Sequence, residues 1–148
     1  MERPVIIMQS LLVLLATFQV ATGCMCAELD LASLLCNPDL TVIGATTQEK
    51  ADRTIDYMDG DILNQQFSGT TYKMQLLNTF KTGPNEIRTD NSIFETFSDR
   101  KVSMCGFELL VGTEYLLAGT VNDKGEFTTN LCLLVPWENL SESEVNLL

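Results

Sequence analysis

The chain has 148 residues, a formal net charge of −11 and no histidine. This acidic balance argues against nucleic acid or an anionic membrane surface as a partner. Without histidine there is no Ser-His or Cys-His nucleophile pair, no histidine general base and no His-ligated zinc, so an enzyme is not expected and no cofactor is implied.

The first segment has the layout of a secretory signal peptide. Val5 to Val20 is almost wholly apolar, Arg3 precedes it, and small residues stand at Ala21 and Gly23. We therefore expect residues 1–23 to be removed, so that Cys24 becomes the first residue of a secreted, extracellular protein. An uncleaved membrane anchor is the weaker reading, because no basic stop-transfer cluster follows. A bacterial lipoprotein signal, which would acylate Cys24, is the other alternative.

A strand is predicted at 39–46, which is rich in β-branched and small apolar residues. Residues 48–68 are polar and charged, and we read them as a long connection. Asp56, Asp59 and Asp61 in this connection resemble a calcium loop only loosely, since they lack the order and the terminal Glu of an EF-hand. A solvated turn is the default interpretation.

Further strands are predicted at 70–80 and 86–97, where apolar residues alternate well enough for a half-buried sheet. Residues 115–121 and 127–135 form the clearest hairpin pattern, joined by a turn at 122–125 whose glycine supplies a positive φ. Five strands with polar connections suggest a small all-β domain at 24–148, closed into a barrel so that no sheet edge is left free.

The C-terminal stretch 139–148 is predicted to be helical, with Ser141 as N-cap and Glu144 completing a capping box. Trp137, just before it, is expected in the core or at the barrel rim. Asn139 begins an N-glycosylation sequon and is expected on the surface.

All five cysteines lie after the signal segment: Cys24, Cys26, Cys36, Cys105 and Cys132. A secreted domain of this size is expected to pair its cysteines in disulfides. Because five is an odd number, one of them is left over.

The order of these motifs resembles the N-terminal, netrin-like domain of the tissue inhibitors of metalloproteinases. The matching pieces are Cys24-Met-Cys26, Cys36-Asn-Pro-Asp-Leu, Ser-Met-Cys105-Gly, Tyr-Leu-Leu-Ala-Gly119 and Cys132-x-x-x-Pro-Trp137. The resemblance implies a five-stranded OB-like closed barrel with Cys24 bonded to Cys105 and Cys26 to Cys132. Either bond would contribute on the order of 4 kcal/mol by closing a long loop.

The same resemblance implies a mode of action. The α-amine and carbonyl oxygen of Cys24 would chelate the catalytic zinc of an extracellular metalloproteinase at the position that water normally fills. Met25 would enter the specificity pocket, and Cys26, Ala27 and Glu28 would continue along the cleft. Ser103, Met104 and Cys105 would cover the other side of the cleft.

The sequence departs from the family pattern in four respects. Glu28 stands where the family usually has proline, and Met25 is bulkier than the usual small hydroxyl residue. The family partner of Cys36 lies beyond the terminal helix, so Cys36 is expected to be free or bonded to another chain. The family's second, disulfide-rich domain is not expected. The rival hypothesis is a netrin-like extracellular binding module without inhibitory activity.

Overall fold

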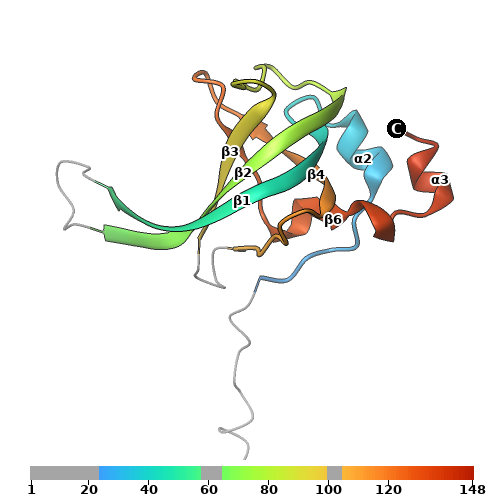
Figure 1. Ribbon diagram of the computed structural model, residues 1–148. Coiled ribbons are helices and arrows are strands. Elements are labelled where there is room, and N and C mark those ends of the chain that lie inside the picture. The colour runs from blue at the N-terminus through green and yellow to red at the C-terminus, as the bar shows by residue number, and fades with distance from the viewer. Residues whose placement is uncertain (1–23, 58–64, 100–104) are drawn as a thin grey trace, which may run out of the picture.

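Two long antiparallel strands dominate the computed structural model, which describes residues 24–57, 65–99 and 105–148 (Figure 1). Strand β1, Thr41–Tyr57, pairs with β2, Gln65–Lys81, from Val42 opposite Lys81 to Tyr57 opposite Gln65. The prediction of a long connection at 48–68 is therefore wrong for most of its length. Residues 48–53 are exposed strand residues and all but Ala51 are polar, so polarity here reflects an exposed ribbon.

The six-stranded sheet has the order β3-β2-β1-β4-β5, with β6 also pairing β4, and all its pairs are antiparallel. The further strands are β3 Ile93–Asp99, β4 Glu114–Val121, β5 Phe127–Thr128 and β6 Leu134–Pro136. Within the described ranges β3 and β5 do not pair, so the sheet is not closed and the expected closed five-strand barrel is not confirmed. Phe94 and Phe127 nevertheless meet edge to face across the opening, with ring centroids 5.7 Å apart.

The third strand begins later along the chain than the predicted range of 86–97. Asp90 and Ile93 bond to each other across a tight turn in which Asn91 and Ser92 have positive φ, and β3 starts only at Ile93. The mostly β character and the β4–β5 hairpin are as predicted. Gly125 has a φ of 81° in the hairpin turn, as its sequence position requires.

The predicted strand 127–135 is interrupted after two residues. The Thr129 hydroxyl donates to the Ala118 carbonyl, and Asn130 then caps the short 3-10 helix η2, Leu131–Leu133. These local bonds divert the chain from the β5 ladder before it returns to the sheet as β6.

Three further short helices lie at the ends of the described chain. Helix α2, Leu31–Cys36, was not expected, and its N-cap Asp30 accepts from the Ala32 N–H. After β6 come the 3-10 helix η3, Trp137–Asn139, and α3, Glu142–Val145. The capping box of Ser141 and Glu144 is confirmed, although the helix is shorter than the predicted 139–148.

The sheet separates two hydrophobic clusters. The larger lies inside the curve of the sheet and includes Ile43, Tyr72, Met74, Leu109 and Leu117, all essentially inaccessible to solvent. The smaller joins the other face to α2 and the C-terminal helices, where Phe80 stacks on Trp137 with centroids 5.9 Å apart. No helix among the described residues is both long and apolar enough to cross a membrane.

Candidate functional site

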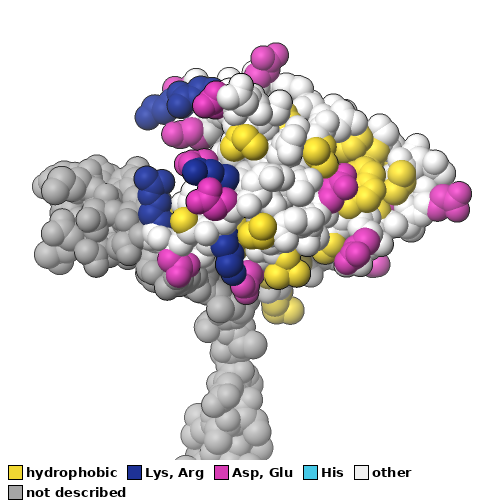
Figure 2. Space-filling view, in the orientation of Figure 1, with side chains coloured by type: hydrophobic (Ala, Val, Ile, Leu, Met, Phe, Trp, Pro, Cys, Tyr) yellow, Lys and Arg dark blue, Asp and Glu magenta, His cyan; other side chains and the backbone are white. Residues whose placement is uncertain are grey.

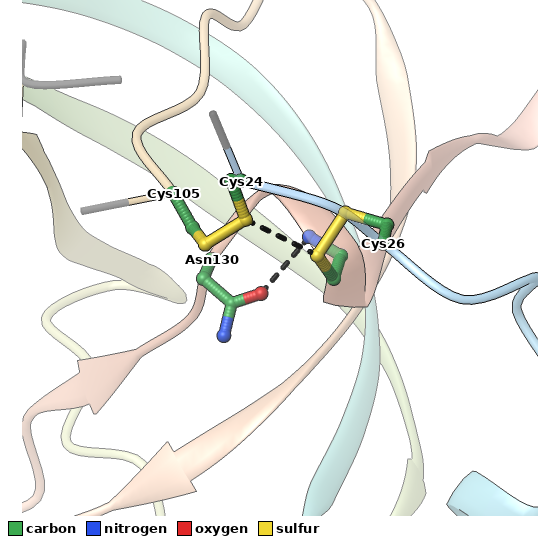
Figure 3. Close-up of a disulfide and its surroundings, with 5 residues drawn as sticks. Cys24, Cys26, Cys105 and Asn130 are labelled. Carbon is green, nitrogen blue, oxygen red and sulfur yellow. Dashed lines mark hydrogen bonds between the residues drawn. A yellow bond between two sulfur atoms is a disulfide. The ribbon is translucent and has the colours of Figure 1, made fainter. Parts of the chain in front are cut away.

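The N-terminal segment is fastened to the domain at two neighbouring points. Cys24 is bonded to Cys105 and Cys26 to Cys132, with Cα atoms 5.1 Å apart in each pair (Figure 3). These are the two bonds that the family resemblance implies. Only Met25 separates the two anchored cysteines, so the tripeptide is held across the domain at both of its ends.

Cys105 reaches the N-terminal segment through a tightly held loop. Its φ of 53° lies in the left-handed region, which is unusual for a residue other than glycine. Gly106 follows, and a Cβ there would come within 1.8 Å of the Asp99 carbonyl oxygen, so only glycine fits this approach. Phe107 is then bonded through both its N–H and its carbonyl to the buried Ser98 hydroxyl, at 2.6 Å each.

Cys132 is positioned by the cap of η2. The Cys132 N–H donates to Asn130 Oδ1 at 2.9 Å, and this bond is one of the dashed lines in Figure 3. The Leu131 N–H donates to the Cys105 carbonyl at 2.9 Å. This backbone bond joins the two loops that hold the N-terminal segment, so the two disulfides share one support.

The two disulfides also touch each other. Cys24 Sγ lies 3.5 Å from Cys132 Sγ, the contact drawn as a dashed line in Figure 3. Neither sulfur carries a proton, because both are in disulfides, so the contact is one of van der Waals type. The Sγ atoms of Cys24, Cys26 and Cys132 lie within 4.8 Å of one another, but none is a thiolate that could ligate a metal.

Exposure rises sharply after Cys24. Cys24 is half-buried, whereas Met25 is 90 % exposed, and Cys26, Ala27 and Glu28 are exposed as well. Glu28 makes no ion pair with any described residue. Ser103 and Met104, the predicted second part of the contact surface, lie outside the described residues, as do the signal segment and its cleavage site.

A cavity of about 490 Å³ adjoins Cys24, and sequence reasoning did not foresee it. Cys24, Leu131 and Phe107 line one part, and the ion pair of Lys50 with Glu108, 3.4 Å apart, lines another. Leu131 is 43 % exposed beside the disulfides. Its place directly before Cys132 was the available signal that it would lie at this site.

The remaining candidate residues lie elsewhere. Cys36 is exposed at the end of α2 and forms no disulfide with a described cysteine. Asn139 is exposed at the end of η3. Asp56 lies in β1 opposite Gln66, while Asp59 and Asp61 fall outside the described residues.

The charged side chains form no continuous basic surface on the face shown in Figure 2. Acidic side chains are spread over that whole face, and the basic ones lie in the half toward the β1–β2 ribbon. Two of the basic residues, Lys50 and Lys73, are paired with Glu108 and Glu49.

Comparison with known proteins supplies the family. A search of curated proteins found no match. The family model described as "Tissue inhibitor of metalloproteinase" matches residues 22–148, which is most of the chain and includes both disulfides. The chain therefore belongs to the tissue inhibitor of metalloproteinase family.

Proposed function

We propose that this protein is a secreted inhibitor of zinc metalloendopeptidases and that Cys24, freed by cleavage after Gly23, binds the zinc of its target. The observation that carries the proposal is the double tether of the Cys24–Met25–Cys26 tripeptide, in which Met25 and Cys26 are exposed. Membership of an inhibitor family supports the partner class. We also infer an OB-like, netrin-type arrangement, to which the approach of Phe94 and Phe127 lends support.

The proposed chemistry follows from the preferences of zinc. A catalytic zinc keeps one position open for water. The α-amine and carbonyl oxygen of Cys24 would take that position as a five-membered chelate and displace the attacking water. An α-amine has a pKa of about 7.7 to 8, low enough for zinc to bind it deprotonated at physiological pH. An inhibitor of this kind blocks the enzyme stoichiometrically.

The tethers matter because they reduce the entropy lost on binding. A free N-terminal tripeptide would have to be ordered when it enters the cleft, whereas here both cysteines are already bonded to the domain. Met25, projecting between them, would fill the specificity pocket of the protease, and burying such a side chain is worth about 1.5–3 kcal/mol. Ala27, Glu28, Ser103 and Met104 would extend the contact.

Glu28 favours a second candidate function. Its carboxylate is exposed and unpaired among the described residues, and it would face a cleft that also holds the catalytic acid of the protease. Like charges at such a contact cost affinity. This observation supports a non-inhibitory extracellular binding module of the same fold as the alternative.

The test uses two forms of the protein that differ at one end. Protein beginning at Cys24 is titrated against a panel of matrix metalloproteinases beside protein with one alanine added before Cys24. We expect stoichiometric inhibition of at least one enzyme by the first form and a large loss with the second, because the added residue converts the amine to an amide. Equal inhibition by both forms would exclude chelation. Absence of inhibition by either would favour the binding module.

Secretion and processing are tested separately. The intact mass of the secreted protein under non-reducing conditions reports the cleavage site, any glycan at Asn139 and the state of Cys36 together. We expect a mass that begins at Cys24. A mass that retains residues 1–23, or one with an acyl group on Cys24, would contradict the proposed free terminus.

A further inference from the structure

The contact between the two disulfides gives Cys24 a second partner within reach. Its bonded partner is Cys105, but Cys132 Sγ lies only 3.5 Å from Cys24 Sγ. Thiol–disulfide exchange proceeds by attack of a thiolate on a disulfide sulfur, so access of the thiolate is a main determinant of the rate. If the Cys26–Cys132 bond were opened, Cys132 would already be in contact with the sulfur that it must attack.

The exposure of the two sulfurs determines which one an external thiol reaches. Cys26 is exposed, whereas Cys132 is half-buried. An external thiolate therefore reaches Cys26 Sγ more readily, and attack there releases Cys132 as the leaving thiolate. Cys132 is held in place meanwhile, since Asn130 binds its N–H and Leu131 binds the Cys105 carbonyl.

The second step is close to balanced in chain entropy. Replacing the Cys24–Cys105 bond, with a sequence separation of 81, by a Cys24–Cys132 bond, with a separation of 108, changes the loop-closure factor by only about 1.5-fold. Local structure therefore decides the direction. Cys105 has a φ of 53°, which costs free energy for a residue other than glycine, and opening its disulfide removes one of the constraints that hold its backbone there.

We propose that a small thiol such as glutathione switches the N-terminal segment from Cys105 to Cys132. The thiolate attacks Cys26 Sγ, forming a mixed disulfide at Cys26 and expelling Cys132 as a thiolate. The Cys132 thiolate attacks Cys24 Sγ, forming the Cys24–Cys132 bond and expelling the Cys105 thiolate, which takes up the proton that the small thiol gave up. Two disulfides are consumed and two are formed, so no further oxidant or reductant is needed.

The switch alters the proposed contact surface. Cys24 stays tethered, but the Cys105 loop, which would carry Ser103 and Met104 against a protease, loses its covalent link to the N-terminal segment. Cys26 at the same time acquires a bulky adduct. The exchange is independent of the proposed inhibitory function, and only this consequence rests on it.

The experiment maps the bonds directly. Mature wild-type protein is treated with glutathione, quenched in acid, alkylated and cleaved with cyanogen bromide and trypsin. Cleavage after Met25, Met104 and Lys124 places the four cysteines on separate peptides. We expect glutathione on Cys26, a Cys24–Cys132 linked peptide and alkylated Cys105. Glutathionylated Cys26 with alkylated Cys132 and an intact Cys24–Cys105 bond would overturn the proposal, and so would a first attack on the Cys24–Cys105 bond.

A matched pair of variants removes the need for the external thiol. Cys26→Ser leaves a Cys132 thiol beside Cys24, and a substantial fraction of this variant should carry the Cys24–Cys132 bond with Cys105 alkylated. Cys132→Ser leaves the Cys26 thiol instead. Because Cys26 is only two residues from Cys24, a bond between them would close a very small ring, so this variant should keep the Cys24–Cys105 bond. If either variant fails to fold, the bond map of the glutathione-treated wild-type protein still tests the proposal. Repeating that arm with Cys36→Ser should give the same map, and loss of the exchange there would show that the free Cys36 thiol is the attacking group.

Discussion

The hydroxyl of Ser98 and the backbone of Phe107 form a reciprocal pair. Ser98 Oγ accepts from the Phe107 N–H and donates to the Phe107 carbonyl, both at 2.6 Å and both buried. The pair fixes the chain two residues after Cys105 to the end of β3, where no strand ladder holds it. The rigidity of the disulfide site therefore depends on a serine that precedes Cys105 along the chain and bonds to Phe107 rather than to the disulfides themselves.

Ser98→Ala should destabilise the non-reduced protein by about 1–3 kcal/mol, because it leaves the buried N–H and carbonyl of Phe107 without their partner. Urea unfolding should show a lower midpoint with an unchanged slope. Thr79→Ala, at an exposed position of β2, is the control and should change stability by no more than about 0.5 kcal/mol. Equal midpoints for the two variants would contradict this role of Ser98.

Two buried threonines should respond oppositely to the same substitution. Thr96 is 2 % exposed, and its hydroxyl has no hydrogen-bond partner among the described residues, whereas the Thr129 hydroxyl donates to the Ala118 carbonyl at 2.7 Å. Valine has nearly the same shape as threonine. Thr96→Val should therefore be neutral or stabilising by up to about 1 kcal/mol, and Thr129→Val should cost about 1–2 kcal/mol. The pair is compared by thermal unfolding, and a larger loss at Thr96 would reveal an unseen partner.

Glu28 is expected to limit inhibition through its charge. Removing that charge with Glu28→Gln should strengthen binding to an inhibited metalloproteinase by about tenfold, equivalent to about 1.4 kcal/mol. Inhibition by the wild type should improve as salt is added, since ions screen the repulsion, and inhibition by Glu28→Gln should depend less on salt.

Glu28→Pro, compared with Glu28→Gln, separates the effect of charge on binding from the effect of backbone rigidity. It removes the same charge and also restricts the backbone, so it should bind at least as tightly as Glu28→Gln. Inhibition constants measured in parallel give the comparison. If neither variant differs from the wild type, Glu28 lies outside the contact.

The cap of α3 should respond to acid. Hydrogen bonds from the Ser141 backbone N–H and hydroxyl to the Glu144 carboxylate hold the pKa of Glu144 below the ordinary range of a glutamate. A lowered folded-state pKa means that the stabilisation is present above the ordinary glutamate pKa and is lost as the pH falls through the lowered value. Carboxyl NMR titration should show this lowered pKa, together with loss of α3 amide protection at acidic pH.

Ser141→Ala should return the pKa of Glu144 part of the way toward the ordinary value, since it removes the hydroxyl bond to the carboxylate but keeps the backbone N–H, which contributes more to the lowering. Ser143→Ala is the matched control, because Ser143 contacts the Ser141 hydroxyl but makes no bond to Glu144. A pKa that is unchanged in Ser141→Ala would assign the shift to another cause.

The sequence by itself determined the features that depend on neighbouring residues. The β4–β5 turn follows from Gly125, and the α3 cap follows from Ser141 and Glu144, because each is made within a few residues. Helix α2 had such a local signal too, in Asp30 followed by Leu31 and Leu34 at helical spacing. The order of the cysteine motifs together with the Tyr-Leu-Leu-Ala-Gly119 and Pro-Trp137 pieces was sufficient to indicate the family.

The tertiary structure decided whatever depends on pairing across long separations. Strands β1 and β2 continue through polar residues because they pair with each other along their length. The polarity of those residues does not indicate this pairing. The ending of β5 after Thr128 and the opening between β3 and β5 depend on contacts such as that of Thr129 with Ala118. The contact between Cys24 and Cys132 arises because the Cys105 loop and η2 are bonded to each other, and no local pattern encodes a distance between residues 108 positions apart.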